Sequence, residues 1–193
     1  MMINFAGKKM KFSEYQKLFT QIISNPTNEA PYNDHSYFEY TKLNNSRLNR
    51  WLKKGELSEE IKIIISEMKT PQKWILISEP WCGDAAHSVP FIFMISELSE
   101  HISLEIQLRD SYSEIDSYLT KGGKSIPKLI IRNEKNEDLA VWGPRPEKCI
   151  VLFEEIREKQ LTFEEQKIIL QNWYNEDKGI MIQEEIGELL KSI

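Results

Sequence analysis

The sequence predicts an α/β fold, a mixed central sheet flanked by helices, and three observations support this prediction. Between about residues 73 and 159, short apolar runs typical of strands alternate with helical patterns in the order β-α-β-α-β-β-α. A helix separates the first two strands, which makes them parallel neighbours. A short polar turn joins the last two strands, which makes that pair antiparallel.

The strands and helices of this central segment follow from the spacing of its apolar residues. The run 74–77 is continuously apolar, as expected for a central strand buried on both faces. Residues 102–108 alternate apolar and polar positions and predict a second strand. The helical spacing at 84–99 contains Pro90, which predicts a kinked helix. The other expected elements are a short helix at 113–119, hairpin strands at 126–131 and 139–142, and a helix at 147–159.

Helical patterns also fill both ends of the chain, and a linker with two prolines interrupts the first of them at 25–34. No segment repeats internally. The helices expected outside the centre are 12–23, 43–52, 57–68, 163–174 and 180–193.

These assignments divide the chain into a helical N-terminal extension (1–56), a central α/β core (57–160) and a helical C-terminal extension (161–193), packed as one domain. The extensions have apolar faces that are expected to pack on the core, and a dimer surface is the alternative. Both a monomer and a homodimer remain open. The apolar positions assigned to these faces are Leu43, Leu48, Trp51, Leu52, Ile168, Leu170, Trp173, Ile180, Ile182, Ile186 and Leu189.

Composition and charge exclude several classes of function. The 193 residues include 25 basic and 30 acidic side chains, for a formal net charge of −5, so no general nucleic-acid binding is expected. The apolar runs are far shorter than the ~18 residues of a membrane-spanning helix. The N-terminus lacks the apolar region of a secretory signal, although it carries lysines. We therefore expect no nucleic acid or membrane as a partner, and a cytoplasmic, bacterial protein.

The chain has only two cysteines, Cys82 and Cys149. Two cysteines 67 residues apart exclude a disulfide framework and a cysteine-rich zinc site. Both are expected to be thiols at rest in a reducing compartment. The sequence therefore predicts no metal and no cofactor.

The chemistry of the chain is predicted to lie in the turn Trp81-Cys82-Gly83-Asp84, between the first strand and its following helix. A cysteine at a helix N-terminus faces unpaired backbone N–H groups and the positive end of the helix dipole, which stabilise a thiolate. The Asp84 carboxylate opposes this effect, so we expect a pKa for Cys82 only modestly below that of a free thiol. The alternative is that Cys82 is one more buried small residue, and Asp84 could simply cap the helix.

Several spacings in this region together resemble those of the thioredoxin family. Trp81-Cys82-Gly83 with Pro90 looks like the active-site turn and kinked helix of thioredoxin, and Ser125-Ile126-Pro127 looks like its cis-proline loop. Gly143 follows the last strand, where the family's substrate groove has a glycine. The resemblance covers about residues 57–160 and implies a thioredoxin-like fold with a cis Pro127 close to Cys82. It makes Cys82 the expected catalytic residue and implies a substrate-binding set of Trp81, Gly83, Asp84, Ile126, Pro127 and Gly143.

Two positions depart from the thioredoxin pattern. Ala85 stands where the family has its second cysteine, so no neighbouring thiol can resolve a mixed disulfide on Cys82. Leu76 stands where thioredoxin carries a buried acid beneath the site. The remaining chemistry is that of a single cysteine, similar to that of monothiol glutaredoxin-like proteins, although those have serine at the position of Ala85.

Other candidates near the turn have simpler interpretations. His87 lies about 140° around the helix from Cys82 and is expected to be a lone surface histidine. Cys149 is expected to be a packed thiol with a raised pKa rather than a resolving partner. Three basic residues, Arg109, Lys124 and Arg145, are either solvated charges or a site for the carboxylates of a small anionic thiol.

Two hypotheses of function follow. In the first, Cys82 forms mixed disulfides with a protein or a low-molecular-weight thiol or disulfide, in cell redox homeostasis, without the turnover of a dithiol reductase. In the second, the chain is a catalytically inactive binding module that uses the groove around Trp81, Pro127 and Gly143. A free peptide strand could pair beside Pro127 in such a groove.

Overall fold

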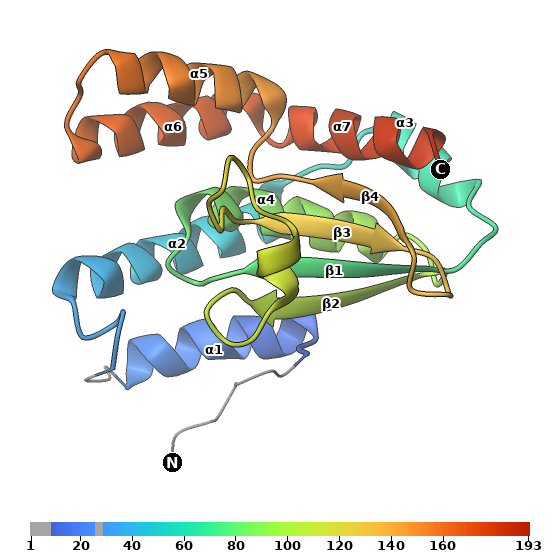
Figure 1. Cartoon of the computed structure of the whole chain (residues 1–193), viewed down its shortest axis with the longest axis horizontal. Helices are drawn as coiled ribbons and strands as arrows, with labels where there is room; N and C mark the ends of the chain where they lie inside the picture. Colours follow the sequence, from blue (N-terminus) through green and yellow to red (C-terminus); the bar gives the residue numbers. More distant parts are fainter. Residues whose placement is uncertain (1–8, 26–28) are drawn as a thin grey trace.

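A four-stranded mixed sheet forms the centre of the protein, as the sequence predicts (Figure 1). The computed structural model describes residues 9–25 and 29–193. The strand order is β2-β1-β3-β4; β1 is parallel to β2 and antiparallel to β3, and β3 is antiparallel to β4. The strands are β1 (Gln72–Ser78), β2 (Ile102–Leu108), β3 (Lys128–Arg132) and β4 (Asp138–Trp142).

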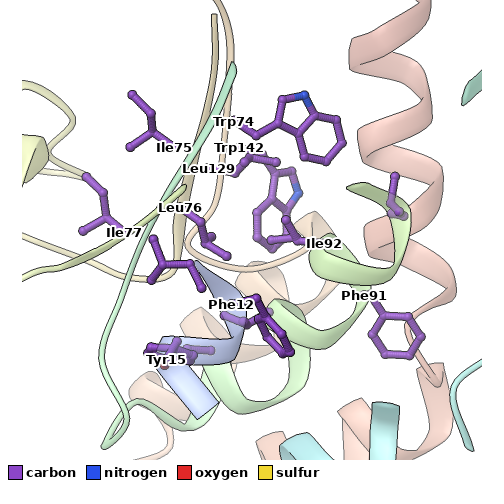
Figure 2. Packing of buried hydrophobic residues seen from close by; sticks show 14 of the residues in the cluster. Phe12, Tyr15, Trp74, Ile75, Leu76, Ile77, Phe91, Ile92, Leu129 and Trp142 are labelled. Carbon is purple, nitrogen blue, oxygen red and sulfur yellow. The ribbon is translucent and has the colours of Figure 1, made fainter. Parts of the chain in front are cut away.

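The centre of strand β1, residues 74–77, is continuously apolar because both faces of the sheet are covered. Figure 2 shows Ile75 and Ile77 on one side of this strand and Trp74 and Leu76 on the other. All four side chains are fully buried. Leu76 faces the side on which Ile92 of the following helix packs.

Helices surround the sheet on both faces and along both edges. In Figure 1, α4 and α2 lie behind the sheet and the 3-10 helix η1 in front, α1 lies along β2, and α5, α6 and α7 lie on the β4 side. Their bounds are α1 (Phe12–Ser24), α2 (His35–Lys54), α3 (Glu59–Ser66), α4 (Gly83–Ser96), η1 (Glu114–Ser117), α5 (Glu147–Glu158), α6 (Phe163–Asp177) and α7 (Ile180–Lys191).

Most predicted elements are present, and among the boundaries that differ, two have an identifiable physical reason. Helix α2 begins at His35 rather than near residue 43, because the Asp34 side chain accepts hydrogen bonds from the backbone N–H groups of Ser36 and Tyr37. Strand β3 begins at Lys128 rather than residue 126, since Pro127 has no N–H to donate to the sheet. None of the described helices is long and apolar enough to cross a membrane.

The extensions pack on the core, but not with every residue predicted for their apolar faces. Trp51 of α2 and Ile186 of α7 are buried in the common core. Leu43, Ile168 and Ile180 are exposed, so their assignment to the packed faces is wrong. The packed face of α2 is partly polar, because Asn44 and Arg47 occupy helical positions that face the core, and this displaces the apolar stripe expected from the sequence.

His87 is buried in a junction of three helices, so its prediction as a surface histidine is also wrong. Its Nδ1 accepts a hydrogen bond from Trp51 Nε1 at 2.9 Å, and its Nε2 lies 3.2 Å from Gln171 Oε1. The imidazole stacks on Tyr174 with ring centroids 4.4 Å apart. Burial, with a smaller effect of Arg47, lowers the pKa of His87 to about 3. The neutral ring therefore joins α2 and α6 to α4.

This junction predicts a loss of stability in acid. The pKa of His87 is lower in the folded chain than in the unfolded chain. The contribution of the neutral imidazole to the free energy of unfolding is therefore present above pH ~6.5 and is lost as the pH falls toward 3. At pH 5 the loss is about 2 kcal/mol. Urea unfolding at pH 7 and pH 5 measures it, with His87→Gln as the control. If the variant shows the same pH dependence as the wild type, the assignment to His87 is wrong.

Candidate functional site

Cys82 lies at the N-terminus of α4, at the end of the turn that follows β1. It is the N-cap residue of this helix, and its Sγ accepts a hydrogen bond from the backbone N–H of Ala85 at 3.4 Å. Its own backbone N–H donates to the carbonyl of Glu79 at 3.0 Å, which closes the turn. The predicted position of the cysteine at a helix N-terminus is confirmed.

The loop before β3 lies against this cysteine. The Ile126–Pro127 peptide bond is cis, and Cys82 Sγ donates to the carbonyl oxygen of Ile126 at 3.4 Å. Antiparallel pairing of β1 with β3 explains the proximity, since Ile77 at the end of β1 is opposite Lys128 at the start of β3. The prediction of a cis Pro127 close to Cys82 is confirmed.

Gly143 packs directly on the backbone of Pro127. It has a φ of +108°, and a Cβ at this position would lie 2.3 Å from the Pro127 carbonyl oxygen. A conformation that L side chains rarely adopt and a backbone neighbour at this distance together require glycine. The Lys128 ammonium donates to the Gly143 carbonyl at 2.8 Å and holds the two loops together.

Trp81 and Gly83 are covered from the extension. The Trp81 ring lies edge-on to Tyr37 of α2, with centroids 5.9 Å apart, and beneath the guanidinium of Arg109 at 4.5 Å. A Cβ on Gly83 would lie 2.4 Å from the Tyr40 hydroxyl oxygen. The motif turn is therefore in close contact with α2.

The predicted net shift of the Cys82 pKa is wrong in direction, because burial outweighs the helix N-terminus. Burial raises the pKa of Cys82 to about 12, and the neighbouring Asp84 carboxylate adds to the rise. The hydrogen bond from Ala85 N–H and the charge of Arg145 lower the pKa, but by less. Cys82 is only 7% exposed. At neutral pH it is therefore a thiol, held between the Ala85 N–H and the Ile126 carbonyl.

Asp84 joins the site to the C-terminal part of the chain. Its Oδ2 pairs with the Arg145 guanidinium at 2.7 Å, and its Oδ1 accepts a hydrogen bond from the Tyr174 hydroxyl at 2.9 Å. Asp84 is thus more than a helix cap. Sequence reasoning missed Tyr174, because nothing in the sequence indicates which residue of α6 approaches a turn 90 positions earlier.

The three basic residues proposed as an anion site each have a carboxylate partner. Arg145 pairs with Asp84, Arg109 with Asp110 at 2.8 Å, and Lys124 with Asp116 at 2.8 Å. These pairs neutralise the charges that a small anionic thiol would need. This set of residues does not form a free cationic patch.

Cys149 and Glu79 are two further buried titratable groups near the site. Cys149 is fully buried in α5, and burial raises its pKa to about 12, in the predicted direction. Glu79 accepts a hydrogen bond from the Asp110 backbone N–H, and burial raises its pKa to about 7. Sequence reasoning missed Glu79, although an acid directly after an apolar strand was a visible signal. Among the described residues no group of three or more potential ligands is placed to hold a metal ion.

A pocket of about 470 Å³ opens beside the cysteine, and the sequence did not indicate it. Its lining includes Cys82 and the other three residues of the motif turn. Residues of α2, α5 and α6 form the other walls, so both extensions contribute to it. These elements are far apart in the sequence, and only the folded chain brings them together.

Comparison with known proteins agrees with this fold. The thioredoxin family model matches residues 30–159, a segment that begins before the predicted core boundary at residue 57 and includes α2. A crystal structure of an HIV epitope scaffold has a TM-score of 0.56 at 12% identity, over 95% of this chain and 99% of that chain. A crystal structure of a protein of unknown function from Pseudomonas aeruginosa has a TM-score of 0.56 at 11% identity, over 94% and 98%. No curated protein matches the sequence.

A mixed sheet with a cysteine at the N-terminus of α4 and a cis-proline loop against it defines an α/β protein of the thioredoxin-like class. The family model covers more than half of the residues, so the chain belongs to the thioredoxin family. At their level of identity, the two solved structures establish the fold alone.

Substitution of Gly143 tests the packing of the cis-proline loop. Gly143→Ala is expected to reduce stability by more than about 3 kcal/mol, since a strained φ and a backbone clash add together. The control is Gly122→Ala, where φ is +80° but nothing lies within 4 Å of the added Cβ, with an expected loss of about 1 kcal/mol. Thermal unfolding compares the two variants. Equal losses would contradict the close contact between Gly143 and Pro127.

Two substitutions should shift the pKa of Cys82 in opposite directions. Asp84→Asn removes the negative charge but keeps an acceptor for Tyr174, so the pKa of Cys82 should fall and its alkylation at pH 8 should accelerate about three- to tenfold. Arg145→Gln removes a positive charge that lowers this pKa, and should slow the reaction. Timed labelling with iodoacetamide and mass spectrometry measures both rates. Shifts in the same direction would show that the charges do not control Cys82.

Proposed function

We propose that the protein carries out one-cysteine thiol–disulfide exchange through Cys82. The observation that supports this most directly is the placement of the Cys82 sulfur, which contacts the cis-proline loop and lines the 470 Å³ pocket. A reacting sulfur needs a place for its substrate, and this pocket supplies one. Cys149 is fully buried, so Cys82 is the better candidate of the two.

The proposed reaction has two exchange steps. Cys82 loses its proton to solvent, and the thiolate attacks one sulfur of a disulfide. A bond forms between Sγ and that sulfur, the original S–S bond breaks, and the departing half leaves as a thiolate that takes up a proton. A low-molecular-weight thiol then attacks the mixed disulfide, forms a new disulfide with the bound half and releases Cys82. This external thiol takes the place of the resolving cysteine that is absent at Ala85.

The environment of Cys82 makes this chemistry slow at rest. The thiol has a pKa of about 12, chiefly because it is buried, so only a very small fraction is thiolate at neutral pH. Cys82 in this state is a stable thiol that reacts only with a disulfide held next to it. The pocket therefore has to contribute binding, since intrinsic thiolate reactivity is low.

A specific observation favours a second candidate function, a binding module without chemistry. The Cys82 sulfur has hydrogen-bond partners on both sides, the Ala85 N–H and the Ile126 carbonyl, as a structural thiol would. In this case the pocket would hold a ligand and Cys82 would only line it. Formation of a mixed disulfide separates the two functions.

Exposure to a small disulfide is expected to modify Cys82 and leave Cys149 free. The full-length protein is incubated with oxidised glutathione and mapped by mass spectrometry, with Cys82→Ser and Cys149→Ser as matched variants. The adduct should be lost in Cys82→Ser alone. Alkylation of Cys82 should accelerate about tenfold per pH unit up to pH ~11, because its pKa is about 12. A native protein that forms no adduct on Cys82 would favour the binding module.

The wild-type protein is expected to lack the turnover of a dithiol reductase. Without a second cysteine at Ala85, each cycle depends on an external thiol to release Cys82, so the rate at which dithiothreitol reduces a model protein disulfide should stay far below that with a dithiol thioredoxin at the same concentration. Ala85→Cys creates a Cys-Gly-Asp-Cys turn and should raise the rate above that of the wild type. Wild-type turnover comparable to that of a dithiol thioredoxin would instead point to Cys149 as a resolving thiol, and Cys149→Ser would then abolish it.

A further inference from the structure

The pocket beside Cys82 has aromatic walls, to which both the extensions and the core contribute. Tyr37 and Tyr40 of α2, Phe153 of α5, and Phe163 of α6 line it together with Trp81. A volume of about 470 Å³ lies within the range of sites that hold small organic molecules. Such walls fit a ligand with an apolar or planar body.

Among the described residues that line the pocket, Arg47 is the only charged one without an opposite charge beside it. Asp84 pairs with Arg145, and Glu164 pairs with Lys167 at 2.6 Å. No Asp or Glu of the described residues pairs with Arg47. The lining of the pocket therefore carries an excess of one positive charge.

The position of Arg47 makes this excess charge significant. The residue is only 8% exposed, and its guanidinium donates to the Asn44 side-chain oxygen at 2.8 Å and lies 5.0 Å from the centre of the Tyr40 ring. A buried guanidinium has five N–H donors, and buried charges in proteins are normally paired. An anion in the pocket would supply the missing partner.

We propose that this pocket binds a low-molecular-weight thiol or disulfide with a carboxylate and an apolar body, and that Arg47 binds the carboxylate. This inference rests on the proposed exchange function for its sulfur chemistry, because Cys82 lines the same pocket. Arg47 acts as a specificity residue, since it selects anionic substrates. It replaces the set of Arg109, Lys124 and Arg145, whose charges are already paired.

Two aromatic disulfides test the role of Arg47. The first, 5,5′-dithiobis(2-nitrobenzoate), carries a carboxylate on each half, and the second, 4,4′-dithiodipyridine, carries none. Arg47→Gln should slow the reaction of Cys82 with the first about tenfold and with the second less than about twofold. The control Lys42→Gln removes the same charge from an exposed position of α2 and should change neither rate. Equal effects of Arg47→Gln on both disulfides would overturn the proposal.

A binding measurement separates this proposal from the proposed function. In Cys82→Ser, calorimetry should detect 3-phenylpropionate but not its amide, and Arg47→Gln should abolish the binding. Carboxylate binding of this kind without any exchange at Cys82 would support the anion site and reject the exchange function. Exchange at Cys82 that Arg47→Gln slows equally for both disulfides, without carboxylate binding, would support the function and reject the anion site.

A wild-type measurement covers the case in which Arg47→Gln does not fold. In that case 3-phenylpropionate should raise the melting temperature of the wild-type protein and its amide should not, because only the carboxylate carries a negative charge that can pair with Arg47. Equal stabilisation by acid and amide, or none by either, would overturn the proposal.

Discussion

The antiparallel pairing of β1 with β3 is the constraint on which the site depends. The turn after β1 and the loop before β3 belong to adjacent strand ends, so the pairing places Cys82 against the Ile126–Pro127 peptide. The pairing of β3 with β4 then brings Gly143 onto the other side of the same loop. Three segments separated by up to 61 positions meet because their strands are hydrogen-bonded in this order.

Two opposing effects act on Cys82 at this meeting point, and burial is the larger. A helix N-terminus stabilises a nearby negative charge by ~0.3–1 kcal/mol. The rise in the pKa of Cys82 from 9.0 to about 12 corresponds to about 4 kcal/mol against the thiolate, the helix contribution already included. The site is thus built around a protonated thiol, and any reaction depends on how a substrate is held.

The helical extensions have more than a packing role. Helix α2 supplies Tyr37, Tyr40 and Arg47 to the pocket, and α6 supplies Tyr174, which fixes Asp84. The neutral His87 ring links both helices to α4, so the walls of the pocket and the N-terminus of α4 are held as one unit. In this chain the fold of the thioredoxin family carries a pocket that the core alone would lack.

The sequence by itself determined the sheet, the position of Cys82 at a helix N-terminus, and the cis Pro127 beside it. These features follow from local patterns, apolar runs and turn residues, together with spacings that resemble those of the thioredoxin family. Only the tertiary structure decided the exposure of His87, the partners of Asp84 and the pKa of Cys82. Each of these depends on which distant side chains arrive from α2, α5 and α6, and on how much water they exclude. A sequence pattern indicates the side of a helix or strand on which a residue lies. Which other side chains cover that side is decided by the packing of the whole chain.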